Sequence, residues 1–199
     1  MNEITQITSQ KKGDRLNVHV DGRFAFGVHY ETAVKFGLKT GRELSPADIE
    51  QIEEEEGNVF AFNRALKYAV KKRVSVKQMS DYLVRNGYSL AATQRAIDKL
   101  KEYGYVGDES FAKAYVATYG EARGARRIEF ELKKAGVPEQ IIADALCELD
   151  ESSACDKCID KYVRTHKDVD KKKLISYLLY RGFEYDEINE SIERSELWK

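Results

Sequence analysis

The sequence predicts a mainly α-helical protein: three tandem three-helix repeats in an elongated, curved array, preceded by a small N-terminal β-hairpin region. Three observations lead to this fold class. The 199 residues include only two prolines, so many helices can run without a break. Apolar residues recur at helical spacing through most of the chain, and this pattern itself recurs with a period of about 47 residues. Only the first 44 residues show the alternation that is typical of strands.

The first segment, residues 1–44, is expected to hold the hairpin and a short helix. Apolar and polar residues alternate over 16–20 and again over 24–28, on either side of Asp21-Gly22. This arrangement favours a type I′ turn, because both central residues of that turn need positive φ. Residues 4–9 are the candidate for a third strand, and residues 30–36 for the short helix.

Residues 45–57 are predicted to form an acidic linking helix. Ser45 is a good N-cap, and Pro46 suits the first helical position. Residues 43–56 include seven acids and no base, which is typical of an exposed helical face. Gly57 marks the point where this helix is expected to kink or break.

Three-helix repeats are predicted at 58–105, 106–150 and 151–199. Each contains an anchor glycine (Gly87, Gly136 or Gly182) with a leucine four residues before it. A glycine in this place fits the end of a helix, where the backbone turns left-handed. The helices are expected at 58–72, 76–86 and 90–103, at 109–119, 125–135 and 139–149, and at 152–165, 171–181 and 185–197. One bundle of this size has a marginal core, so neighbouring repeats should stack.

Composition and charge bear on three classes of protein: nucleic-acid-binding, membrane and secreted proteins. The net charge of −1 argues against attraction of the whole surface to nucleic acid, although acidic and basic stretches alternate along the chain. No stretch approaches the roughly 20 apolar residues that a membrane helix needs. No signal peptide is evident, and three cysteines favour a reducing compartment over a disulfide framework. We therefore expect a cytoplasmic protein that does not contact a membrane.

The sequence contains no motif that predicts catalysis. A phosphate loop with its lysine, a nucleophile elbow and an HExxH motif are all missing, and the three histidines are scattered. We expect no cofactor, no small-molecule substrate and no enzymatic activity.

The cysteines leave two alternatives open. Cys155 and Cys158 form a CxxC motif, which could act as a redox pair. Together with Cys147 and His166, the two cysteines could instead supply four zinc ligands. Cys158, however, aligns with Phe111 of the second repeat, which indicates a core position. Structural cysteines without a metal are therefore the favoured interpretation.

A recurring cation is the main candidate for a binding surface. Ten residues before each anchor glycine lies Lys77, Arg126 or Lys172, in the second helical position if Ser75, Gly124 and Asp170 are the N-caps. The helix dipole disfavours a cation there by about 0.3–1 kcal/mol. Free N–H groups beside cations would form an anion site for phosphates or acidic side chains, whereas the alternative is ordinary solvated charge. The candidate partner-binding residues are Lys71, Lys72, Arg73, Lys77, Arg126, Arg127, Lys171, Lys172 and Lys173.

These same segments resemble the RecX family. Residues 72–87 look like its R-x-S-x-x-[EQ]-[LM] helix, with Gln78 before Met79. Residues 104–115 are similar to its GY-[LIV]-x-D-x-x-[FY]-A-x-x-[YW] signature, except that Gly107 stands where an acid is common. The resemblance covers roughly 57–199, and the start, ending at 41–44, looks like an extension found in some members from Gram-positive bacteria.

The resemblance implies a cytoplasmic bacterial regulator that binds the RecA recombinase. Members of the family lodge in the groove of the RecA–DNA filament, limit its growth, and inhibit its ATPase, strand-exchange and coprotease activities. The alternative is direct DNA binding, since the last two helices of each repeat resemble a helix-turn-helix. The third helices, however, begin with neutral or acidic residues, so only weak contacts to the DNA backbone are expected.

Overall fold

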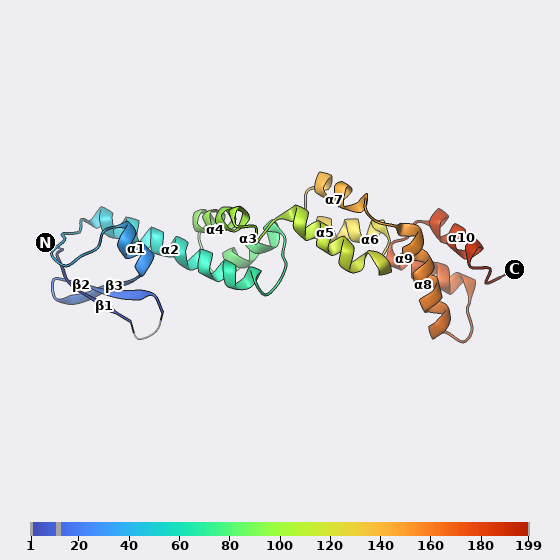
Figure 1. Cartoon of the computed structure of the whole chain (residues 1–199), viewed down its shortest axis with the longest axis horizontal. Helices are drawn as coiled ribbons and strands as arrows, with labels where there is room; N and C mark the ends of the chain where they lie inside the picture. The colour runs from blue at the N-terminus through green and yellow to red at the C-terminus, as the bar shows by residue number, and fades with distance from the viewer. Residues whose placement is uncertain (1, 11–12, 199) are drawn as a thin grey trace. The chain divides into compact units, whose positions relative to one another are not determined.

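The computed structural model describes residues 2–10 and 13–198. It confirms a mainly helical chain with a small antiparallel sheet at its N-terminal end (Figure 1). The chain divides into two compact units, Met1–Lys71 with Ser80–Tyr105 and Lys72–Met79 with Val106–Lys199. No helix within the described residues is long and apolar enough to cross a bilayer.

The first unit begins with a sheet of three strands in the order β1-β2-β3. Its strands are β1 (Ile4–Ser9), β2 (Arg15–Val20) and β3 (Arg23–His29), so the proposed third strand is confirmed. Asp21 and Gly22 have φ of 49° and 78°, as the predicted turn requires. Helix α1 (Tyr30–Lys35) follows β3 directly, and Val18 and Val28 face a small core that also includes Ile52.

Helix α2 (Pro46–Ala69) corrects one expectation. The chain runs through Gly57 without a break, so the linking helix and the first helix of the first repeat are one element. Ser45 and Asp48 form the capping box that begins it. A helical glycine costs only about 1 kcal/mol relative to alanine. Burial of Ile52, Ala61 and Ala65 on both sides of Gly57 offsets that cost.

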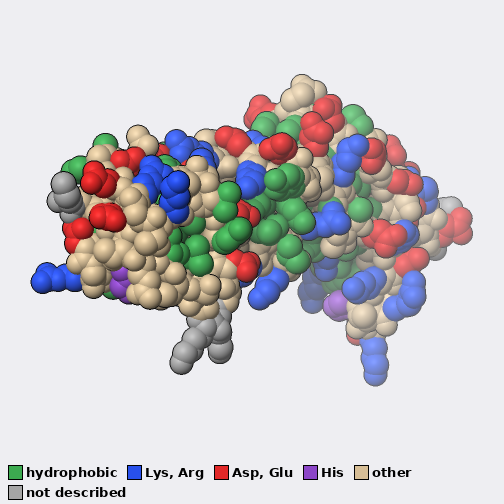
Figure 2. All heavy atoms as spheres, turned by 60° about the vertical axis from the view of Figure 1, so that its left-hand side comes forward, with side chains coloured by type: hydrophobic (Ala, Val, Ile, Leu, Met, Phe, Trp, Pro, Cys, Tyr) green, Lys and Arg blue, Asp and Glu red, His purple; other side chains and the backbone are tan. Residues whose placement is uncertain are grey.

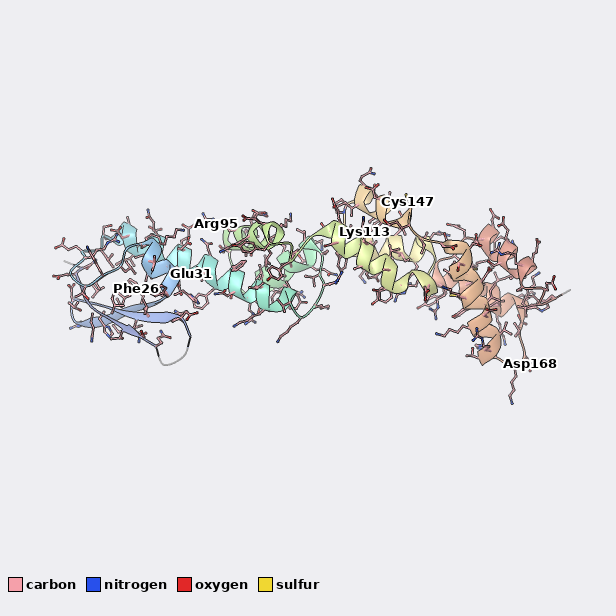
Figure 3. All side chains as sticks on the ribbon, viewed as in Figure 1. Phe26, Glu31, Arg95, Lys113, Cys147 and Asp168 are labelled. Atoms are coloured by element: carbon pink, nitrogen blue, oxygen red, sulfur yellow. The ribbon has the colours of Figure 1, made fainter. Side chains whose placement is uncertain are left out.

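Helices α3 (Val76–Arg85) and α4 (Leu90–Glu102) complete the first repeat, and α4 packs along α2. Between them Gly87 has φ of 85°, as its anchor position predicts. Figure 3 labels Arg95 on α4, whose guanidinium lies 3.1 Å from the Glu54 carboxylate of α2. Both side chains are exposed, so this pair adds little stability.

The second unit holds the other two repeats. The second repeat consists of α5 (Asp108–Tyr119), the 3-10 turn η1 (Gly120–Ala122), α6 (Ala125–Lys134) and α7 (Glu139–Leu146). The third consists of α8 (Glu151–Thr165), α9 (Lys171–Arg181) and α10 (Tyr185–Arg194). Each has its own apolar core. Gly136 and Gly182 have φ of 79° and 91°, which confirms the anchor positions.

Candidate partner-binding surface

The three recurring cations occupy the helical position that the sequence predicts. Lys77, Arg126 and Lys172 are the second residues of α3, α6 and α9. Gly124 and Asp170 are the N-caps of α6 and α9, and the Asp170 carboxylate accepts from the Lys173 N–H at 3.0 Å. Each cation therefore lies at the unfavourable end of a helix dipole.

The start of α3 is fixed to the second repeat by hydrogen bonds. The Ser75 hydroxyl is buried and donates to the Ala135 carbonyl at 2.5 Å. The Val76 N–H donates to the Asp108 carboxylate at 2.9 Å. In addition, the Gln78 side chain accepts from the Ser75 N–H at 3.2 Å, as in a capping box. The first turn of α3 is thus held on the turn before Gly136 and on the start of α5.

The start of α6 makes the equivalent contacts to the third repeat. The Gly124 N–H donates to the Arg181 carbonyl at 3.0 Å, one residue before the anchor glycine, just as Ala135 precedes Gly136. The Ala125 N–H donates to the Glu151 carboxylate at 3.0 Å, which matches the bond from Val76 to Asp108. We call this arrangement the repeat joint: the start of one repeat's second helix lies on the next repeat's anchor glycine turn.

The repeat joint corrects the idea of free N–H groups at these helix starts. At α3 and α6 the first helical N–H is already bonded to a carboxylate of the neighbouring repeat. An external anion would have to displace Asp108 or Glu151 to reach it. What remains for a partner is the set of cationic head groups.

Some of those cations also have internal contacts. The Lys77 stem lies over Gly136, where a Cβ would come within 2.2 Å of the Lys77 Cδ atom. Arg127 contacts Glu131 at 2.8 Å, and Arg126 contacts Glu184 at 3.2 Å. The exposed pair of Arg126 and Glu184 is weak, so the Arg126 head group stays available.

Eight of the nine candidate residues lie in the second unit, and Lys71 lies in the first. Lys72 and Arg73 are exposed in the segment before α3, and Lys171, Lys172 and Lys173 are exposed at the start of α9. Figure 2 shows basic and acidic side chains interspersed over the face that it draws. The charge pattern there is not a single basic field.

A polar cluster inside the second repeat was not found from the sequence. Glu131 accepts hydrogen bonds from the Tyr115 hydroxyl at 2.7 Å and from Arg127, and it also pairs with Arg123. Burial alone would raise the pKa of Glu131, but these hydrogen bonds and the two guanidinium charges lower it. Tyr115 is only half-buried and serves this cluster. No local pattern in the sequence links the Tyr115 hydroxyl to Glu131, which lies 16 residues further along the chain.

The cysteines fit the structural interpretation. Cys155 and Cys158 are buried in the core of the third repeat, while Cys147 is exposed at the end of α7 (Figure 3). Burial raises the pKa of Cys155 to about 11 and also raises that of Cys158. Within the described residues, no group of three His, Cys, Asp or Glu side chains is placed to hold a metal.

We expect the three thiols to differ sharply in reactivity. Because the thiolate is the nucleophile, Cys147 should react quickly with a disulfide reagent such as DTNB at pH 8. Cys155 and Cys158 should react only when the third repeat opens. Counting thiols before and after addition of urea tests this expectation, with Cys147→Ser as the control that removes the fast phase. Three equally fast thiols in the folded protein would contradict it.

Comparison with known proteins identifies the family. The model of the regulatory protein RecX N-terminal domain matches residues 2–45, and that of the RecX second three-helix domain matches residues 108–146. Regulatory protein RecX of Bacillus subtilis (strain 168) is 31% identical over 97% of this chain and 77% of its own length. Regulatory protein RecX of Clostridium perfringens (strain 13 / Type A) is 31% identical over 98% of this chain and 96% of its own length.

Solved structures share the fold. A crystal structure of regulatory protein RecX matches with a TM-score of 0.79 and 23% identity, over 96% of this chain and 100% of that one. A crystal structure of RecX from Lactobacillus salivarius matches with a TM-score of 0.63 and 23% identity, over 72% of this chain and 99% of that one. With relatives of about 30% identity along nearly its whole length, the chain belongs to the RecX family of regulatory proteins.

Proposed function

We propose that this chain is a non-catalytic regulator that binds the RecA recombinase and its filament on DNA in the bacterial cytoplasm. It limits filament assembly and thereby lowers ATP hydrolysis, strand exchange and coprotease activity. The observation that carries the proposal is kinship with proteins named regulatory protein RecX along nearly the whole chain. The recurring cations at the starts of α3, α6 and α9 support it, because all three residues are exposed at the same position of their helices.

The test adds the full chain to RecA on single-stranded DNA and follows ATP hydrolysis together with filament length by electron microscopy. We expect both to fall at less than one copy of the chain per RecA subunit. No effect on either quantity, combined with tight binding to bare DNA, would favour a direct DNA-binding protein instead.

Neutralising the recurring cations tests which surface is used. Lys77→Gln, Arg126→Gln and Lys172→Gln together should weaken binding to the filament by roughly tenfold at physiological salt, since solvent-exposed charges act mainly on association. Because the helix dipole disfavours a cation at this position, the folded state should be slightly more stable without these three. A matched control is the triple variant Lys101→Gln, Lys113→Gln and Lys161→Gln, whose exposed lysines lie away from the second-helix starts. Equal affinity of the two triple variants would remove the recurring cations from the binding surface.

A further inference from the structure

A groove lies along α5 of the second repeat, apart from the recurring cations at the helix starts. It has a volume of about 630 Å³ and lies entirely within the second unit. Its floor is one face of α5, formed by residues such as Phe111, Ala114 and Tyr119. Its other side is lined by Lys72 and Arg73 from the segment before α3 and by Gln78 from α3 itself.

The repeat joint holds the two sides of this groove in place. The bonds from Ser75 to Ala135 and from Val76 to Asp108 lie just beyond Lys72 and Arg73 in the sequence. Gln78, which also lines the groove, is fixed by its bond from the Ser75 N–H. A groove whose side is fixed by hydrogen bonds is ready to bind without ordering a loop.

The charges of the groove are of one sign. Among the residues that the structure describes, Lys72 and Arg73 are the only charged ones that line it, and no acid does. Within residues 2–10 and 13–198, neither makes an ion pair, whereas Arg123, Arg126 and Arg127 of the same unit all do. Two lining cations that form no ion pair with a described residue, beside the apolar side chains of α5, are complementary to acids that flank an apolar side chain.

The aromatic residues of the groove argue against a nucleobase as the occupant. A base stacks on an open ring face. The Arg123 guanidinium lies 4.1 Å from the centre of the Tyr119 ring, and the Tyr115 and Tyr119 rings are 4.5 Å apart.

We propose that this groove binds an acidic peptide segment, with one aliphatic or aromatic side chain seated against α5 and flanking carboxylates on Lys72 and Arg73. The assignment rests on the proposed function in one respect: it takes the segment to be part of the recombinase. The lining residues themselves require only that the bound segment carry acidic groups on either side of an apolar side chain.

The test measures two readouts on the full chain. One is binding of a fluorescein-labelled peptide with the sequence Asp-Glu-Phe-Asp-Glu, and the other is the fall in RecA ATP hydrolysis. Lys72→Glu with Arg73→Glu should weaken both by at least about tenfold, because reversal sets like charges against each other. Ala117→Trp, at an exposed position on the floor, should block the groove to a similar extent without changing charge.

Matched controls lie in the same unit. Lys161→Glu with Lys167→Glu reverses the charge of two exposed lysines outside the groove. Ala143→Trp places a tryptophan at an exposed position of α7, as Ala117→Trp does on α5. Neither should change either readout.

The outcomes separate the two proposals. If the unaltered chain leaves RecA unaffected, the proposed function fails whatever the peptide does. If the chain acts on RecA but the groove variants bind peptide and lower ATP hydrolysis as well as the controls do, the groove assignment alone is overturned. Loss of oligo(dT) binding in the groove variants with unchanged peptide binding would make the groove a nucleic-acid site and also overturn the assignment.

Discussion

Replacing Gly182 with alanine should destabilise the third repeat by about 2–5 kcal/mol, because a backbone penalty of about 1–2 kcal/mol and an overpacking penalty of about 1–3 kcal/mol add. The residue has φ of 91°, which an L side chain adopts at a cost of about 1–2 kcal/mol. The new Cβ would also lie 2.4 Å from the Arg127 Cβ and 2.5 Å from the Arg127 backbone nitrogen. Backbone atoms cannot move aside as a flexible side chain can, so the repeat joint has to open.

Gly87→Ala is the matched control for this prediction. Gly87 holds the same anchor position with φ of 85°, but a Cβ there would meet nothing within 4 Å. We expect a loss of only about 1–2 kcal/mol, the backbone penalty alone. Urea unfolding followed by circular dichroism measures both variants, and the fluorescence of Trp198, the single tryptophan, reports separately on the third repeat. Equal losses for the two glycines would show that the close approach at Gly182 is not a stability determinant.

The contrast between these glycines shows which features of the fold can be predicted from local sequence and which cannot. The left-handed turn at each anchor is a local property, so the leucine and glycine spacing is enough to predict it. The close approach of Gly124 to Gly182 is not local, since a Cβ on Gly124 would lie 2.3 Å from the Gly182 carbonyl oxygen, 58 residues away along the chain. No periodicity in one repeat reveals which residue of the next repeat will lie against it.

The same limit applies to the candidate site. The helix bounds and the position of the recurring cations follow from local patterns and are confirmed at α3, α6 and α9. The carboxylates of Asp108 and Glu151 that occupy the helix starts come from the neighbouring repeat. An acid at the start of a helix already stabilises its own helix through the dipole. Its presence in the sequence therefore does not indicate that it also accepts a hydrogen bond from a helix of the preceding repeat.

A buried acid is the second case in which local pattern misleads. Glu56 belongs to a run of four glutamates that looks like a solvated helical face, yet it is buried under the sheet and α1. It accepts from the His29 N–H at 2.9 Å and from the Thr32 hydroxyl at 3.0 Å. It also lies 3.3 Å from the Arg15 guanidinium and 2.6 Å from the His29 ring. One carboxylate thus ties together β2, β3, α1 and α2.

Glu56→Ala should destabilise the first unit by about 3 kcal/mol, since removing one member of a buried ion pair leaves its partner without compensation. The Thr32 hydroxyl would lose its acceptor in a buried place, which adds to the loss. The measurement is the urea midpoint of the full chain, followed by far-ultraviolet circular dichroism.

Glu53→Ala is the control that separates burial from charge. It removes the same carboxylate from the same run of α2, but Glu53 is exposed, and surface substitutions of this kind change stability by about 0.5 kcal/mol or less. Glu56→Gln should fall between the two variants, because the amide oxygen can still accept from Thr32 while the ion pair with Arg15 is lost. If Glu56→Ala and Glu53→Ala unfold at the same urea concentration, the buried carboxylate does not hold the sheet to the helices, and the apolar core around Ile4, Val18 and Ile52 carries that contact alone.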